Sequence, residues 1–418
     1  MSSSADVAVI GAGIAGLTCA RNLARSGLSV IVLEARGRPG GRILTSSSGG
    51  HRFEAGAEFV HGRNASTLSM LREFGIETEL YAVTEEMPRL YSIAGISDDF
   101  GDKVEQICAA VERYQGPETS VGSLIDSLTS NRLVAEHSKD RFERIEGATT
   151  TDLSATKLAD ERAANQAGWE NFQVVGGYSS LIDGLSRDLK VTYNCPVSAV
   201  RETLGSVIVS YGSRSIPVKA AVVTVPMALL RAGKPRLQLL DANPLRDYNC
   251  RGQGHVVKVY VRFGRPLGRD FSYLHLDAPI RAWWRAPEYR SSDVAVVGFA
   301  GGLTAERFLK NERAAVAECL SQLESSLSHQ LLSSVEDVRV LNWAREKYSR
   351  GSYAYSRVRL SGQGCGQVDG ESPSEATALR VFFAGEALAP NGHVGTVHGA
   401  SESGALAATG VQKSLGAR

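Results

Sequence analysis

The sequence predicts a two-domain α/β fold, and three observations lead to this prediction. The chain has 418 residues, which is long for a single domain. Near its start, two short apolar runs, Asp6–Ile10 and Leu28–Leu33, flank a helix-like stretch from Leu17 to Ser26. Further β-rich runs then alternate with helical segments along the rest of the chain, which is typical of an α/β protein.

The first element is a complete βαβ fingerprint for a bound dinucleotide. Gly11, Gly13 and Gly16 form the pattern GxGxxG directly after the first apolar run. The first glycine permits a tight turn, the second lets backbone amides approach a pyrophosphate, and the third lets helix and strand pack closely. Glu34 ends the second apolar run and is placed to accept hydrogen bonds from a ribose diol. The alternative, a glycine-rich structural turn, would need neither flanking strand nor the acidic residue.

A segment rich in glycine and arginine follows the fingerprint. Ala35 and Arg36 come first, and the adjacent pair Gly40-Gly41 then leads into Arg42. Adjacent glycines allow close approach of the backbone to a ligand, and an arginine can pair with a phosphate. A basic surface loop is the alternative interpretation of this segment.

The middle and the end of the chain contain more predicted elements. Between about Ser66 and Gly168 the pattern is helical and polar, with charged patches such as Lys139–Arg144. Strands are predicted at Phe172–Val175, Val207–Tyr211, Ala220–Val225, His255–Phe263, Asp293–Ala300 and Val381–Phe383, and helices at Ala305–Gln330 and Thr396–Val411.

Composition and charge limit the class of protein. The residues are 43% hydrophobic and 22% charged, as in ordinary globular proteins, and the net charge is +1. This charge argues against nucleic acid or an anionic membrane surface as a partner. Met1–Ala5 lacks the features of a signal peptide, and no apolar run reaches the roughly 18 residues of a membrane span. Six scattered cysteines without CxxC pairs indicate reduced thiols, a cytoplasmic location and no metal site.

Taken in order, the motifs resemble those of a known family. After the fingerprint, they are Gly40-Gly41-Arg42, Val175-Gly176-Gly177-Tyr178, Val223-Thr224-Val225-Pro226, Phe383-Ala384-Gly385-Glu386 and Gly395-Thr396-Val397-His398-Gly399-Ala400. This ordered set resembles the flavin-containing amine oxidase family, which includes monoamine oxidases, polyamine oxidases, L-amino-acid oxidases and lysine-specific histone demethylases. The resemblance is weakest between about residues 80 and 165.

The resemblance implies a discontinuous fold. A Rossmann-type, GR2-like FAD-binding domain would consist of residues 1–65, 171–230 and 346–418. A second, substrate-binding domain would combine a helical part, 66–170, with a mixed sheet and a helix, 231–345.

The resemblance also implies non-covalent FAD and a set of residues that bind it. Glu34 would hold the adenosine ribose, the Val197 backbone would meet the adenine, and the backbone of Thr396 and Val397 would meet the flavin O2 edge. Ser352 stands where monoamine oxidases carry the cysteine that bonds to FAD, and a hydroxyl cannot form that thioether. The full set expected to contact the cofactor is Gly11, Gly13, Ala15, Gly16, Glu34, Ala35, Arg36, Gly41, Arg42, Val197, Glu386, Thr396 and Val397.

Three residues are expected to carry the chemistry. Lys258 matches the family lysine that holds a water against flavin N5, and an exposed strand face is its alternative setting. Tyr353 resembles one wall of an aromatic cage for the amine, whereas Thr396 replaces the second tyrosine of monoamine oxidases. His61 resembles a residue in the substrate tunnel of polyamine oxidases, with a purely structural histidine as the alternative. Glu58, three residues earlier, is a weaker candidate.

The implied reaction is hydride transfer from the amine-bearing carbon to flavin N5. O2 would then be reduced to hydrogen peroxide, and the imine would be hydrolysed to an aldehyde or ketone plus an amine. His61 and Thr396 favour a polyamine or secondary amine as the small-molecule substrate of a monomer or homodimer. One alternative is an L-amino-acid oxidase, in which Arg63 or Arg285 would hold the carboxylate. An alternative of another class is a flavin-binding protein without turnover.

Overall fold

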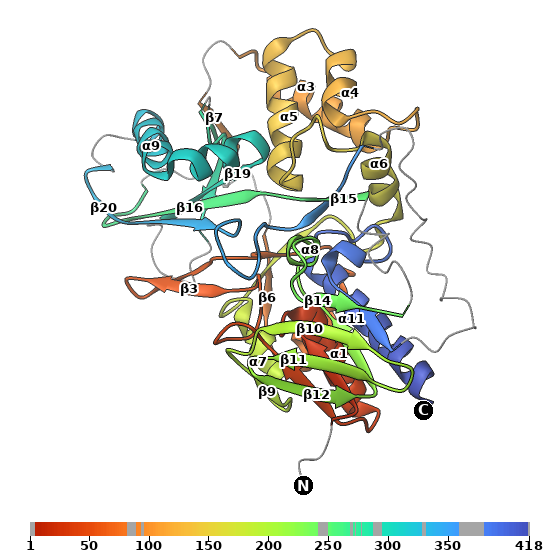
Figure 1. Cartoon of the computed structure of the whole chain (residues 1–418). Helices are drawn as coiled ribbons and strands as arrows, with labels where there is room; N and C mark the ends of the chain where they lie inside the picture. Colours follow the sequence, from red (N-terminus) through yellow and green to blue (C-terminus); the bar gives the residue numbers. More distant parts are fainter. Residues whose placement is uncertain are drawn as a thin grey trace.

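The fold has two lobes, which are visible in a computed structural model of the chain (Figure 1). The structure describes residues 5–81, 89–92, 96–240, 250–267, 271, 273–276, 278–286, 295–327, 332–358 and 380–416. Helices α1 and α11 and the strands β10 to β12 lie in one lobe, together with both ends of the chain. Helices α3 to α6, helix α9 and strand β16 lie in the other.

The first lobe is built on a parallel sheet assembled from distant segments. Its strand order is β22–β13–β1–β2–β9, and every pairing between these strands is parallel. The strands at its centre are apolar and buried throughout, as expected where helices cover both faces of a parallel sheet. Their bounds are β1, Val7–Ile10; β2, Val30–Leu33; β9, Val191–Thr192; β13, Ala220–Val223; and β22, Val381–Phe383.

Two helices that begin near the carboxyl edge of this sheet pack against each other. They are α1, Ile14–Arg25, and α11, Val397–Leu415. A Cβ atom on Gly404 of α11 would lie 2.2 Å from the carbonyl oxygen of Ala15 in α1. Likewise, a Cβ on Gly16 would lie 2.0 Å from the carbonyl oxygen of Gly11. The glycines therefore permit a helix contact that any side chain would prevent.

Further elements complete this lobe. A four-stranded sheet with the order β12–β11–β10–β14 packs beside the parallel sheet and shares an apolar core with it. Its bounds are β10, Val197–Glu202; β11, Val207–Tyr211; β12, Arg214–Val218; and β14, Arg236–Gln238. Three short helices add to the lobe: α2, Ser66–Glu73; α7, Ser179–Ser186; and α8, Met227–Arg231.

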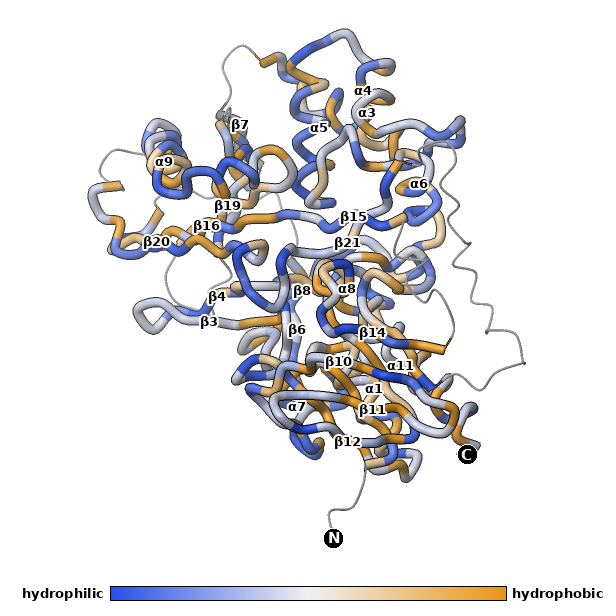
Figure 2. The backbone as a smooth tube through the Cα atoms, in the orientation of Figure 1, coloured by the Kyte–Doolittle hydropathy of each residue, from blue (hydrophilic) through white to orange (hydrophobic). Residues whose placement is uncertain are grey.

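The second lobe contains a six-stranded sheet with the order β20–β16–β19–β18–β17–β7. Strand β16, the second in this order, is hydrophobic along most of its length (Figure 2), and helix α9 packs against it. The bounds are β7, Arg89–Ser92; β16, Val256–Phe263; β17, Tyr273–Leu276; β18, Ala282–Arg285; β19, Ala295–Gly301; β20, Val335–Asn342; and α9, Gly302–Ser326.

Small sheets lie between the two larger ones, and four helices cover the second lobe. The small sheets are β3, Thr45–Ser48, with β4, His51–Glu54; β5, Phe59–His61, with β8, Asn171–Val174, and β6, Thr78–Leu80; and β15, Arg251–Gln253, with β21, Ala354–Ser356. The helices are α3, Phe100–Glu112; α4, Val121–Leu128; α5, Arg132–Glu146; and α6, Ala155–Ala164.

Most predicted elements are present, with shifted ends. The strand expected from His255 begins at Val256, and the helix expected from Ala305 begins at Gly302. Residues 293–294 and 328–330, at the ends of two predicted elements, lie outside the described residues. None of the helices in the described ranges is long and apolar enough to cross a membrane.

The cysteines differ from expectation at one position. Cys19, Cys108, Cys195 and Cys319 are free thiols, whereas Cys250 is disulfide-bonded. The prediction of reduced cysteines throughout is therefore wrong at Cys250. Sequence spacing could not reveal this, because a disulfide depends on the distance between two Cα atoms in the folded chain.

Candidate active site

The turn after β1 forms an open cradle at the edge of the parallel sheet. Gly11 adopts a φ of 110°, and α1 begins after Gly13 without a side-chain cap. A Cβ on Gly13 would meet no other atom within 4 Å, so the space beside this helix end is free. Gly41, with a φ of 60°, borders the same space, because its Cβ would lie 3.5 Å from the Cα of Gly13. Free amides at a helix N-terminus fit a pyrophosphate.

Glu34 fixes the neighbouring corner of the cradle. Its carboxylate is buried and accepts hydrogen bonds from the backbone amides of Ala12, at 2.7 Å, and Arg36, at 2.8 Å. Each oxygen keeps a second lone pair for a further donor, such as a ribose hydroxyl. The Cys195 amide donates to the Glu34 carbonyl at 2.8 Å, and this bond brings the chain leading to Val197 alongside.

Arg36 turns its guanidinium toward the segment before Tyr353. It pairs with Glu346, donates to the Ser349 hydroxyl at 2.9 Å and lies over the Tyr348 ring. The side chain of Arg36 thus connects the segment after β2 to residues 346–349, late in the chain, while its backbone amide donates to Glu34.

A buried polar junction joins three remote segments. Arg42 donates to Glu386 Oε1 at 2.9 Å and to the carbonyl oxygen of Ser352. The other oxygen of Glu386 accepts the Ala354 amide at 2.9 Å. Tyr353 lies within this junction, and its hydroxyl donates to the carbonyl of Ile145 at 2.7 Å. Burial raises the pKa of Tyr353, so the phenol stays neutral.

The start of α11 approaches the Tyr353 ring. A Cβ on Gly395 would lie 3.5 Å from that ring, which places the ring beside the turn into the helix. The Thr396 hydroxyl accepts the Gly399 amide at 3.0 Å and donates to the His393 carbonyl at 2.7 Å. Thr396 is therefore the N-cap of α11, and Val397 is the first residue of the helix.

Lys258 points from the centre of β16 into a buried acidic site. Its ammonium lies 2.6 Å from Glu58 Oε2, 2.8 Å from the Gly56 carbonyl and 3.3 Å from the Glu54 carbonyl. Lys258 and Glu58 are only 8% and 7% exposed. The second oxygen of Glu58 accepts the indole N–H of Trp284 at 2.8 Å. The alternative of an exposed strand face for Lys258 is thereby excluded.

A cluster of aromatic rings extends from this ion pair to His61. Phe59 lies between Trp284, with ring centroids 6.3 Å apart, and Tyr81, at 5.0 Å. The His61 ring is 6.3 Å from Phe59, and its Nδ1 forms a 2.7 Å hydrogen bond with Asn171 Oδ1. His61 itself is exposed, at the end of β5. The cluster therefore leads from an accessible imidazole to a buried ion pair.

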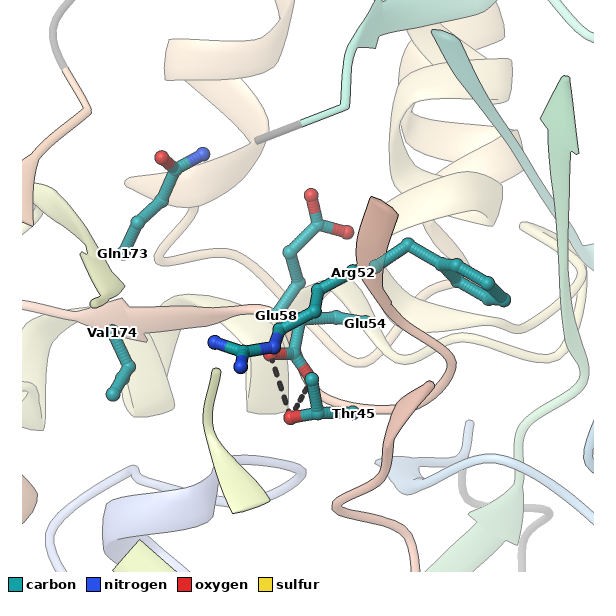
Figure 3. A pocket seen from close by; sticks show the side chains of 7 residues that line it. Thr45, Arg52, Glu54, Glu58, Gln173 and Val174 are labelled. Carbon is teal, nitrogen blue, oxygen red and sulfur yellow. Dashed lines mark hydrogen bonds between the residues drawn. The ribbon is translucent and has the colours of Figure 1, made fainter. Parts of the chain in front are cut away.

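A small cavity of about 10 Å³ lies behind Glu58, which is room for roughly one water molecule. Figure 3 shows Glu54 bending toward Thr45 while the Glu58 carboxylate points away from it. Glu54 accepts the Tyr178 amide at 2.8 Å and the Thr45 hydroxyl at 3.0 Å. Burial outweighs these hydrogen bonds and raises the pKa of Glu54 to about 7.

Two buried histidines support the turn before α11. The rings of His393 and His398 are 4.5 Å apart, and His393 Nδ1 bonds to Glu402 at 2.7 Å. Burial, followed by the charge of His393, lowers the pKa of His398 to about 4. His398 is therefore neutral near neutral pH.

The structure brings most of the predicted residues to one place. The Arg42 carbonyl accepts the Ala57 amide at 3.1 Å, so the Arg42 junction adjoins the segment that holds Lys258. From the sequence, Glu58 is only a weaker candidate for the site, and Trp284 is not identified as a site residue. The only available signal was an acidic residue within the otherwise apolar stretch Ala57–Val60.

Comparisons with known proteins agree with this architecture. The family model for flavin-containing amine oxidoreductases matches residues 14–98 and 115–412. "Lysine-specific histone demethylase 1 homolog 2" of Arabidopsis thaliana is 29% identical over 96% of this chain and 57% of its own length. "Polyamine oxidase 4" of Oryza sativa subsp. japonica is 26% identical over 99% of this chain and 90% of its own.

Solved structures share the fold. A double mutant of putrescine oxidase superposes with a TM-score of 0.83 at 18% identity, covering 98% of this chain and 99% of that one. The chain spans only about half the length of the histone demethylase homologues that it matches, 51–57%.

Proposed function

Because this chain belongs to the family of flavin-containing amine oxidoreductases, whose cofactor is FAD, we propose that it is an amine oxidase for a polyamine or secondary amine. The observation that carries the proposal is that the Tyr353 ring lies beside the start of α11, while Arg42 contacts both the segment before Tyr353 and the segment that holds the Lys258–Glu58 pair. FAD would supply the redox chemistry, accepting a hydride from the amine-bearing carbon and passing electrons to O2 to form hydrogen peroxide.

We assign the cofactor to a discontinuous Rossmann-type domain, 1–65, 171–230 and 346–418, of the GR2-like kind. The open cradle at Gly11–Gly16 would hold the pyrophosphate, and Glu34 the ribose. The N-terminus of α11, at Thr396 and Val397, would face the flavin O2 edge, where its dipole favours negative charge. Ser352 supports non-covalent binding, since serine cannot form the thioether.

The substrate-facing roles follow from the side chains. Tyr353 is fixed through its hydroxyl, which leaves the face of its ring as a wall for the amine. Thr396 offers no second wall, because its short side chain caps α11. Lys258 would present its charge at flavin N5, and the exposed His61 would bind a nitrogen of an extended amine.

Several observations favour an amine without a carboxylate. Arg63, one candidate for holding an amino-acid carboxylate, pairs with Glu170 at 2.6 Å on the surface. Arg285, the other candidate, lies over the Phe271 ring at 5.4 Å. Polyamine oxidases and putrescine oxidase are among the similar proteins.

A peroxide-release assay tests the proposal. The FAD-loaded protein is offered spermine, spermidine, benzylamine and a panel of L-amino acids in air. Peroxide formed from spermine or spermidine supports the proposal. Turnover of amino acids alone would assign the chain to the L-amino-acid oxidases, and no turnover with any amine would leave a flavin-binding protein without catalysis.

A further inference from the structure

The Lys258–Glu58 pair differs from a lysine whose ammonium points toward solvent. An ammonium has three N–H donors, and in Lys258 all three have protein acceptors within 3.3 Å. One acceptor is a carboxylate, and the other two are the carbonyls of Glu54 and Gly56. The direct partner of this lysine is therefore an acidic side chain.

Glu58 is itself held at both oxygens. Trp284 donates its indole N–H to Oε1, and Lys258 occupies Oε2. Trp284 belongs to β18 and Lys258 to β16, so Glu58 connects two strands of the second sheet to the segment before β5. Because Trp284 fixes the carboxylate and the carboxylate fixes the ammonium, neither charge can turn away independently.

Because Lys258 and Glu58 are both buried, their pairing is energetically important. Moving an unpaired charge into a protein interior is costly, so a buried lysine without a counter-ion tends to lose its proton. A carboxylate at 2.6 Å keeps the ammonium charged, and the pair then carries no net charge. The Phe299 ring, 6.0 Å from the ammonium, adds only a weak cation–π contact.

We propose that Glu58 is a positioning residue that holds Lys258 as one half of a neutral ion pair beside the flavin. This inference rests on the proposed function, which places Lys258 at the flavin. Glu58 acts through Lys258 and has no contact with the substrate. Glu58 thereby fixes where the charge of Lys258 lies relative to the flavin.

The midpoint potential of the bound flavin tests this proposal in a double-mutant cycle at pH 7. Glu58→Gln removes the negative charge and is expected to raise the potential, whereas Lys258→Met removes the positive charge and lowers it. Each single change is expected to alter the relative affinity for reduced and oxidised flavin about tenfold, or about 30 mV for a two-electron couple. Because Glu58 acts through Lys258, Glu58→Gln should shift the potential far less in the Lys258→Met background than in wild type, so the double variant should lie close to Lys258→Met.

Two further variants make the result specific. Glu58→Asp keeps the charge and should keep the potential near wild type even where the hydrogen bond is weakened. Glu54→Gln is the matched control, since Glu54 is a neighbouring buried carboxylate that touches Lys258 only through its backbone. Any shift in the midpoint potential that Glu54→Gln causes should be the same in the wild-type and Lys258→Met backgrounds.

The possible outcomes distinguish a failure of this inference from a failure of the proposed function. The inference is wrong if Glu58→Gln shifts the midpoint potential equally in the wild-type and Lys258→Met backgrounds. It is also wrong if Lys258→Met shifts the potential and Glu58→Gln does not. In both cases Glu58 does not act through Lys258. If Lys258→Met itself leaves the potential unchanged, Lys258 does not lie at the flavin and its role in the proposed function is wrong.

Discussion

Arg42 Nη1 lies 2.9 Å from Glu386 Oε1, although 344 residues separate the two in sequence. The same carboxylate accepts the Ala354 amide, so one acidic side chain connects Arg42, near the start of the chain, to the strand β21 near its end. Glu386 is buried, whereas Arg42 retains partial access to solvent. The pair therefore joins a buried carboxylate to a guanidinium that solvent or a ligand can still reach.

Removing this carboxylate should destabilise the protein. Glu386→Ala leaves Arg42 and the Ala354 amide without their acceptor, and breaking a mostly buried ion pair costs about 3 kcal/mol of unfolding free energy. Urea unfolding of the FAD-saturated protein measures the loss. The control is Glu73→Ala, which breaks exposed pairs with Arg21 and Arg25 and should cost under about 1 kcal/mol. Equal losses would show that Glu386 is not a structural centre.

The flavin should be released intact by acid. Ser352 carries a hydroxyl where a covalent link would need a thiol, so precipitation with acid should leave all FAD in the supernatant. The measurement is the flavin absorbance of supernatant and pellet. Flavin that stays with the washed pellet would contradict non-covalent binding.

Replacing His61 should discriminate between long and short amines. A polyamine would have to place its distal nitrogens along the substrate tunnel that His61 is expected to line. Benzylamine has no distal nitrogen and would reach the Tyr353 ring without contacting His61. Loss of one hydrogen bond to a charged group corresponds to roughly 1.5–3 kcal/mol, so His61→Ala should raise the KM for spermine about ten- to a hundredfold. The KM for benzylamine should change much less.

Two observations control this experiment. Asn171→Ala removes the hydrogen bond that orients the His61 ring and should give a smaller loss of the same kind. Equal losses for spermine and benzylamine in His61→Ala would identify His61 as structural and remove the main support for a polyamine substrate.

The stability of the protein should fall in acid partly because of His398. Its pKa is lowered from 6.5 to about 4 by burial, so between these values the unfolded chain binds more protons than the folded one. The contribution of the neutral imidazole is complete above pH 6.5 and is lost as the pH falls toward 4. It amounts to at most about 3 kcal/mol.

Urea unfolding at several pH values between 4 and 7 measures this effect. His398→Gln should flatten the fall in stability over that window. A slope that is the same in wild type and His398→Gln would contradict a buried neutral imidazole.

Local patterns predicted the fold far better than the connections within the site. The fingerprint at Gly11–Gly16 and the strand containing Lys258 were evident, because each depends on neighbouring residues. The partnership of Lys258 with Glu58 spans 200 residues, and that of Trp284 with Glu58 spans 226. No periodicity reports contacts of this range, so only the folded chain reveals them. The contact of His61 with Asn171 depends in the same way on the pairing of β5 with β8.

The strand order of the parallel sheet has a consequence for synthesis on the ribosome. β13 pairs with β1 on one side, but its other edge pairs with β22, near the end of the chain. At about 5–20 residues per second, translation takes roughly ten to thirty seconds to supply that last strand. During this interval the nascent chain carries an apolar strand edge open to wrong pairing, which makes it a natural client for chaperones. Efficient expression should therefore depend on slow growth or chaperone supply, even though β22 covers this edge of β13 in the folded protein.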